Sequence, residues 1–162
     1  MKRLLFLLIF VFSVMAQAGG WVKSYRTAKA QAIRENKKIL IFFSGSDWCE
    51  AGWRLDRELF RTQAFQDLAS RKYVLYNADF PKYTRLGQEA EDRNRSLASR
   101  YGIHHFPAVA VVDPKFGTLL VKQIGLTGTT PKKLLDKLLK IEKDSARPYN
   151  DQKNRNPGKT AP

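Results

Sequence analysis

The sequence is short of cysteine. Cys49 is the only cysteine among 162 residues, and it ends the segment Gly-Ser-Asp-Trp-Cys at residues 45–49. A single cysteine excludes any disulfide bond within the chain. Exported proteins normally use cysteines in pairs, so a single thiol needs an explanation if this chain is exported.

Long apolar runs are lacking after the first eighteen residues, so we expect no membrane-spanning helix in the rest of the chain. Residues 1–18 combine Lys2 and Arg3, an apolar stretch over 4–15, and Ala-Gln-Ala at 16–18. This order is typical of a secretory signal peptide that is cleaved before Gly19. We therefore expect a periplasmic or secreted protein, and an uncleaved N-terminal anchor is the alternative.

Acidic residues are outnumbered. The chain has 29 Lys and Arg against 15 Asp and Glu, a formal net charge of +14. Without Lys2 and Arg3 the balance is 27 against 15, or +12. Such a charge favours acidic partners or anionic surfaces. The cations are scattered and follow no groove-reading motif, so we expect no nucleic-acid ligand and, most simply, a solvated basic surface.

The rest of the chain alternates between helical and strand patterns. Residues 39–43 form an unbroken apolar run, typical of a strand buried on both faces. Gly102 follows a polar helical segment and is placed to end it. The predicted elements are a helix over 21–36, a strand over 39–43, a helix over 48–60, a short helix over 62–71, a strand over 73–78, a helix over 88–102, a β-hairpin over 104–125 and a helix over 129–144.

This order predicts an α/β fold. The early alternation implies parallel strands with right-handed crossovers, and the late hairpin adds antiparallel strands. We expect a single domain over residues 19–144, with a central mixed sheet, helices on both faces and a C-terminal hairpin plus helix. Residues 145–162 are polar, contain three prolines and lack periodicity, so we expect a disordered basic tail.

Two segments carry a family resemblance: Ser-Gly-Ser-Asp-Trp-Cys at 44–49 after a strand, and Tyr-Gly-Ile-His-His-Phe-Pro at 101–107 before one. Together they resemble the thioredoxin family, and more narrowly its exported, disulfide isomerase-like members with a Gly-Ser-Asp-Trp-Cys motif. The resemblance covers residues 21–144. It implies that Cys49 is the catalytic nucleophile and that Pro107 is the family's cis-proline, across from the thiol. Phe106 and Pro107 would bind an extended substrate by strand addition, and Trp48 would shape the rim.

A cysteine at the start of a helix has a physical route to reactivity. Unsatisfied N–H groups and the positive end of the helix dipole favour the thiolate, which attacks disulfides. Asp47 and Glu50 flank the cysteine, and their negative charge would oppose this effect. His104 and His105 precede the proline segment, and a protonated imidazole there would favour the thiolate.

The sequence departs from the family at two places. The family usually has a second, resolving cysteine three residues after the first, and here that position is Gly52. Many members also have a buried carboxylate in the preceding strand, where this chain has Phe42 and Phe43. Without a resolving thiol the protein cannot act alone as a dithiol reductant or oxidant. It would need an external thiol, or a second cysteine of the substrate, to release it.

Simpler interpretations stay open for each residue. Cys49 could be an inert buried thiol, and His104 and His105 could be ordinary loop residues. A Cys–His hydrolase pair is a weaker alternative, because no orienting Asn or Asp is indicated and the fold argues against it. A metal site of Cys49 with both histidines is weaker still, because adjacent histidines in an extended segment point to opposite faces. Trp53 could line a peptide groove or fill the surface, and Asp79 is best explained as a turn residue.

We therefore predict an exported monothiol protein for thiol–disulfide exchange or isomerisation on envelope proteins. Its partners would be cysteine-containing proteins and an external thiol, and it would need no cofactor or metal. The alternative is a redox-inactive, thioredoxin-like module that binds peptides as a chaperone. A weaker third possibility is an electrostatic surface adaptor.

Overall fold

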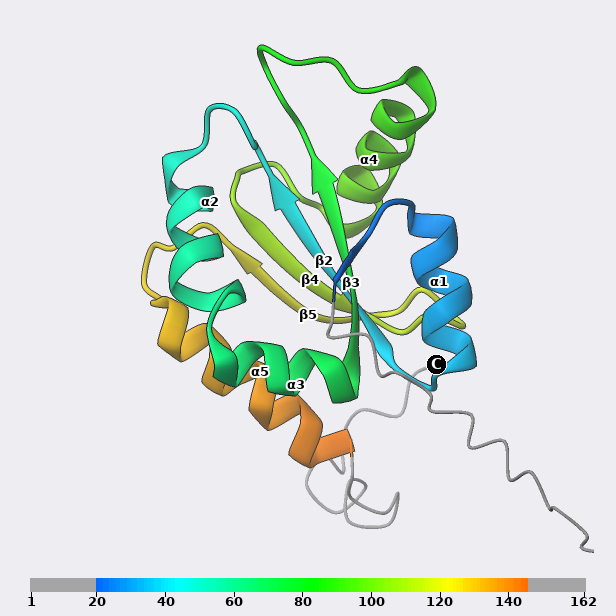
Figure 1. The fold of residues 1–162 in the computed structure, drawn as a ribbon, viewed down its shortest axis with the longest axis vertical. Coiled ribbons are helices and arrows are strands. Elements are labelled where there is room, and N and C mark those ends of the chain that lie inside the picture. The colour runs from blue at the N-terminus through cyan, green and yellow to red at the C-terminus, as the bar shows by residue number, and fades with distance from the viewer. Residues whose placement is uncertain (1–19, 146–162) are drawn as a thin grey trace, which may run out of the picture.

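The computed structural model describes residues 20–145, which form a five-stranded sheet covered by helices on both faces (Figure 1). The predicted signal peptide lies outside the described residues, as does the predicted tail apart from Ser145. The elements are β1 (Trp21–Val22), α1 (Tyr25–Arg34), β2 (Lys38–Ser44), α2 (Glu50–Leu55), a π-helix (Asp56–Phe60), α3 (Gln63–Lys72), β3 (Tyr73–Asp79), α4 (Gln88–Tyr101), β4 (Ala108–Val112), β5 (Leu119–Ile124) and α5 (Pro131–Ser145).

The sheet is mixed, with the strand order β1-β3-β2-β4-β5. β1 and β2 both run parallel to β3, whereas β4 runs antiparallel to β2 and to β5. The central strand, β2, is buried over Ile39–Ser44, as its apolar run predicts. The predicted fold class, an α/β domain with a C-terminal hairpin and helix, is confirmed.

Two hydrophobic cores lie on opposite faces of the sheet. On one face, α1 and α4 bury Ala28, Ala32 and Leu97 against β2 and β3. On the other face, α2, the π-helix, α3 and α5 pack their apolar residues against the same strands, and Phe42 of β2 belongs to this core. Alternate residues of β2 therefore serve different cores, which is the period-two geometry of a strand.

Local signals in the sequence account for several element ends. Ser24 and Thr62 begin α1 and α3 by accepting hydrogen bonds from the N–H groups of Thr27 and Phe65. Gly102 ends α4 in the left-handed conformation, with φ of 60°. In the hairpin turn, Asp113 accepts hydrogen bonds from the N–H groups two and three residues ahead.

The N-terminal helix prediction was wrong at its start and its end. Trp21 and Val22 form a short parallel strand, and the helix begins only at Tyr25 and ends at Arg34. Ile33, near the end of this helix, is 43% exposed. The helix predicted over 48–60 is also divided, because its second half is a π-helix. Within residues 20–145, no helix is long and apolar enough to span a bilayer.

Candidate functional site

Three segments that are distant in sequence meet at one edge of the sheet. β2 and β3 are parallel and in register, with Ser44 opposite Asp79, so the loops that follow them leave from the same edge. β4 is antiparallel to β2, with Ala108 opposite Phe43, so the residues that precede β4 lie at this edge too. The topology thus brings together the Cys49 segment, the segment after Asp79 and the Phe106–Pro107 segment.

Cys49 lies at the junction of this edge with α2. It is the N-cap residue of the helix, in extended conformation, and its N–H donates to the Gly45 carbonyl over 2.8 Å. Its side chain makes no capping hydrogen bond, and the residue is only 6% exposed. The structure therefore places the single thiol where the sequence predicts it, beside the first N–H groups of a helix.

The tight packing of Trp48 explains Gly45. A Cβ atom at Gly45 would lie 2.3 Å from Cε2 and 2.4 Å from Nε1 of the Trp48 indole, far inside van der Waals contact. The indole Nε1 donates a 2.7 Å hydrogen bond to the Phe80 carbonyl. Its ring also meets Phe106 edge-on, with 5.9 Å between the ring centroids. Trp48 thus connects the thiol segment to the other two segments of the site.

Asp79 ties the turn before Cys49 to the end of β3. Its carboxylate accepts hydrogen bonds from the Ser46 N–H (2.9 Å), the Ser46 hydroxyl (2.5 Å) and the Ser44 hydroxyl (3.0 Å). Asp79 was expected only to shape its own turn. In the structure it also fixes the loop that carries the cysteine, because parallel register places it beside Ser44.

The Asp47 carboxylate holds the loop that follows β3. It accepts hydrogen bonds from the N–H groups of Lys82, Tyr83 and Thr84 over 2.8–2.9 Å and from the Thr84 hydroxyl over 3.1 Å. Desolvation opposes the charged form, but these hydrogen bonds outweigh it and lower the pKa of Asp47 to about 2. Asp47 was predicted to modulate the thiolate, and its hydrogen bonds show a structural role that the sequence did not indicate.

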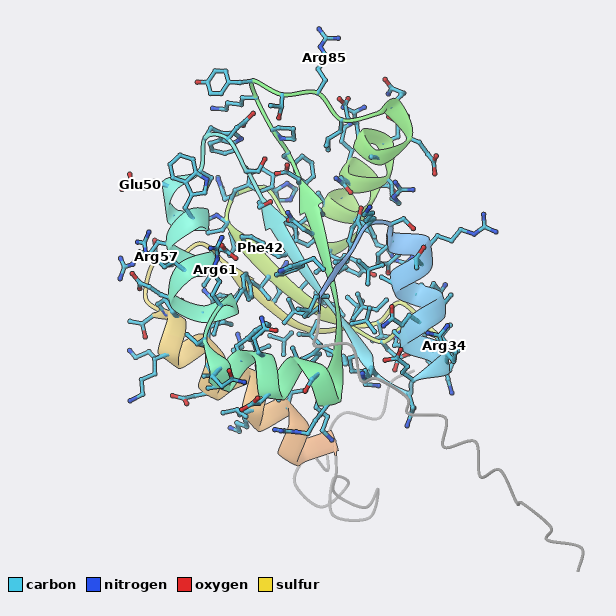
Figure 2. The ribbon with its side chains drawn as sticks, in the orientation of Figure 1. Arg34, Phe42, Glu50, Arg57, Arg61 and Arg85 are labelled. Atoms are coloured by element: carbon cyan, nitrogen blue, oxygen red, sulfur yellow. The ribbon has the colours of Figure 1, made fainter. Side chains whose placement is uncertain are left out.

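The floor of the site, beneath the thiol, is apolar. A Cβ atom at Gly52 would lie 3.5 Å from the Cys49 Sγ, 3.6 Å from its Cβ and 3.8 Å from the Phe42 ring, all ordinary contact distances. The Phe42 ring lies inside the domain beneath α2 (Figure 2) and packs against Phe60, with 4.8 Å between centroids. Gly52 therefore lies next to Cys49, and the Phe42 ring lies next to Gly52.

The other predicted site residues differ in their exposure. The Phe106–Pro107 peptide bond is cis, and Pro107 is buried. His104 and His105 are exposed, and Glu50 is exposed at the outer end of α2 (Figure 2). Trp53 is 48% exposed and donates to the Ser46 carbonyl over 2.8 Å, so it braces the cysteine turn. In residues 20–145, no group of three or more His, Cys, Asp or Glu side chains could hold a metal ion.

Sequence reasoning missed two residues of the rim, Phe80 and Lys82. The Phe80 ring packs on Phe106, with 4.8 Å between centroids, and its carbonyl binds Trp48. The Lys82 ammonium lies 4.2 Å from the centroid of a Trp48 ring, a cation–π contact. The sequence gives little indication of these contacts, because nothing in Phe-Pro-Lys at 80–82 shows that these residues pack against Trp48.

A domain with this sheet order, a thiol at the start of α2 and a cis-proline before β4 is that of a thioredoxin-like protein. Residues 20–114 match the thioredoxin-like family, and the chain belongs to it.

Among curated proteins, the chain is similar to the disulfide bond reductase DsbH of Chlamydia pneumoniae, at 26% identity over 91 residues. It is also similar to the thioredoxin-related protein DsbJ of the same organism, at 22% identity over 92 residues. The first match covers 56% of this chain and 55% of DsbH, and the second covers 57% of this chain and 26% of DsbJ. The chain thus spans about half or less of these two relatives.

Solved structures share more of the fold. A DsbH oxidoreductase superposes with a TM-score of 0.65 at 24% identity, over 75% of this chain and 84% of that one. A disulphide isomerase from Xylella fastidiosa Temecula1 superposes with a TM-score of 0.54 at 25% identity, over 72% and 87% of the two chains.

Proposed function

We propose that this protein is an exported, monothiol thioredoxin-like protein in which Cys49 exchanges with disulfides of envelope proteins. The observation that carries the proposal is the position of the only thiol, at the N-cap of α2 and beside the Trp48–Phe106 contact. The similarity to a disulfide bond reductase and to a disulphide isomerase supports the same chemistry. The signal-like residues 1–18 support export.

The exchange would proceed in two steps. The Cys49 thiolate attacks one sulfur of a client disulfide, an S–S bond forms to Cys49, and the other client sulfur leaves as a thiolate. A second thiolate then attacks the client sulfur of this mixed disulfide and releases the Cys49 thiolate. If the second thiolate belongs to the client, the net result is isomerisation. If it comes from a small thiol, the client disulfide is opened, and one client sulfur is left bonded to the small thiol while the other is a free thiol.

The surroundings of Phe106 support a place for the client. Phe106 lies outside the strands, and in the described part of the chain its N–H and C=O form no backbone hydrogen bond. An extended client segment could therefore pair with this backbone, next to the thiol, as an added strand. Phe80, Trp48 and Phe106 would supply the apolar contact surface.

The experiment that tests this function follows mixed disulfides on Cys49. The purified protein is incubated with a peptide that contains one disulfide, and intact mass spectrometry detects the covalent adduct. Addition of glutathione should then regenerate the free thiol and turn over more peptide. The Cys49→Ser variant is the control, and it should form no adduct.

The same variant separates exchange from binding alone. If the unsubstituted protein forms no adduct, while both it and Cys49→Ser bind the peptide equally, the exchange function is wrong. The protein would then be a peptide-binding module of thioredoxin fold.

A further inference from the structure

The loop that joins β3 to α4, residues 80–87, projects at the top of the domain, beyond the ends of β2 and β3 (Figure 1). Its first half is firmly attached, because Asp47 binds the N–H groups of residues 82–84. The loop is thus tied to the residue two positions before the thiol. A client that reaches Cys49 would meet this loop next.

Three exposed side chains of the loop, Lys82, Tyr83 and Arg85, are cationic or aromatic. Tyr83 is 81% exposed, and Arg85 extends outward from the domain at the tip of the loop (Figure 2). Lys82 is exposed and lies over Trp48. Within residues 20–145, neither Lys82 nor Arg85 forms an ion pair.

The acidic groups near the loop do not neutralise it. Asp47 is occupied by four hydrogen bonds from the loop, and Asp79 by Ser44 and Ser46. Three carboxylates in the first turns of α4 are paired within that helix, Glu89 with Arg93 and both Glu91 and Asp92 with Arg95. Glu50, at the start of α2, is exposed. The loop therefore presents two unpaired cations and an exposed tyrosine ring to whatever approaches the thiol.

Building on the proposed exchange function, we infer that residues 82–85 select clients with acidic residues next to their reactive disulfide. Client carboxylates would pair with Lys82 and Arg85, and Tyr83 would offer an apolar ring with a polar tip. Complementary charge of this kind raises the rate of encounter more than the final affinity. The expected signature is therefore a faster attack by Cys49 on acidic clients.

The test compares two peptides of equal length that differ only in Glu or Gln beside one cysteine. Each cysteine is first linked by a disulfide to thionitrobenzoate. The Cys49 thiolate attacks the peptide sulfur, an S–S bond to Cys49 forms, and thionitrobenzoate leaves as a coloured thiolate whose absorbance gives the rate. At low salt, the Glu peptide should react roughly five-fold faster than the Gln peptide, and high salt should reduce this ratio toward one.

Three variants make the test specific. In the double variant Lys82→Gln, Arg85→Gln the rate ratio should fall to about one, and charge reversal by Lys82→Glu, Arg85→Glu should favour the Gln peptide. The control Arg26→Gln, Lys29→Gln removes the same charge from exposed positions of α1, on the face covered by α1 and α4, and should keep the ratio.

The two failures are distinguishable. The recognition role is overturned if the Glu-to-Gln rate ratio is unchanged in the loop variants, or if it falls equally in the α1 control. In either case the rate measured with the Gln peptide still demonstrates exchange. If Cys49 attacks neither peptide, the proposed function fails and the recognition role fails with it. Unchanged circular dichroism of the variants establishes that they are folded.

Discussion

The two sides of Cys49 are built differently. On the side of Gly45–Trp48, every residue makes a specific contact: Gly45 makes room for Trp48, Ser46 binds Asp79, Asp47 binds the loop over 82–84 and Trp48 binds the Phe80 carbonyl. On the floor, Gly52 and Phe42 offer only van der Waals contact. The polar side fixes the segment that carries the Cys49 thiol. The two floor residues, Gly52 and Phe42, carry neither a second thiol nor a base that could deprotonate one.

This difference shows what each side of Cys49 would do under the proposed exchange function. The polar side would position the attacking sulfur, through the hydrogen bonds of Ser46, Asp47 and Trp48. Resolution of a mixed disulfide within the chain would depend on the floor, and there the chain has a glycine and a phenylalanine ring. The architecture thus fits a protein whose release step depends on a thiol from elsewhere.

The largest effect is expected when the floor is made polar. Phe42→Asp removes a ring that is 5% exposed and buries a carboxylate among apolar side chains. We expect it to lower the free energy of unfolding by about 4 kcal/mol, because a large core cavity and an unpaired polar group both destabilise. Urea unfolding measures this loss. Phe42→Leu is the control and should cost about 1 kcal/mol; equal costs would mean that the floor tolerates polarity.

The second effect comes from overpacking the polar side. In Gly45→Ala the added methyl group would overlap the Trp48 indole, so the ring must move away from Phe80 and Phe106. We expect a loss of about 2 kcal/mol in the free energy of unfolding. Tryptophan fluorescence and thermal unfolding detect the change. Gly87→Ala is the control without steric overlap, since a Cβ atom there would meet nothing within 4 Å; because Gly87 is the N-cap of α4, it should cost less than about 1 kcal/mol.

The third effect is local to the loop over 82–84. The folded-state pKa of Asp47, about 2, lies below the ordinary value of 3.8, so its stabilisation of the loop is present above pH 3.8. It is lost as the pH falls through about 2. Amide resonances of residues 82–84 should therefore titrate with a midpoint near pH 2. Asp47→Asn should increase the exchange of these amides at neutral pH, whereas Asp136→Asn on α5 should not; a midpoint near 4 would contradict the assigned hydrogen bonds.

Sequence reasoning predicted the fold where the pattern was long. The apolar run of β2, the Gly102 cap and the antiparallel hairpin each carry a local signal, and each is confirmed. β1 was missed because two residues show no periodicity and pair only with β3, about fifty positions away. The π-helix was missed because its apolar spacing differs little from that of an α-helix over one turn.

The residues around the thiol were predictable from the sequence, but the hydrogen bonds that hold them in place were not. Trp48, Cys49, Phe106 and Pro107 were found by resemblance. The partners of Ser46 and Asp47 lie more than thirty residues away in sequence, and these hydrogen bonds exist only because β2 and β3 are in register. The requirement for glycine at position 45 is steric and depends on a side-chain rotamer, which a single sequence does not specify.

The smallest effect on stability, and the sharpest test of the comparison, comes from Gly52→Cys. A Cβ atom there would lie 3.6 Å from the Cys49 Cβ, within the range of about 3.5–4.5 Å that disulfides use. The neighbours are at ordinary contact distances, so we expect the free energy of unfolding of the reduced protein to change by less than about 1 kcal/mol. Under oxidised glutathione, intact mass spectrometry should show an intramolecular disulfide and no glutathione adduct. Ala51→Cys places a thiol on an exposed position and should accumulate adducts. If Gly52→Cys also retained glutathione on Cys49, a thiol at position 52 would be unable to resolve the mixed disulfide. The absence of a second sulfur would then not be the only reason why the floor cannot resolve one.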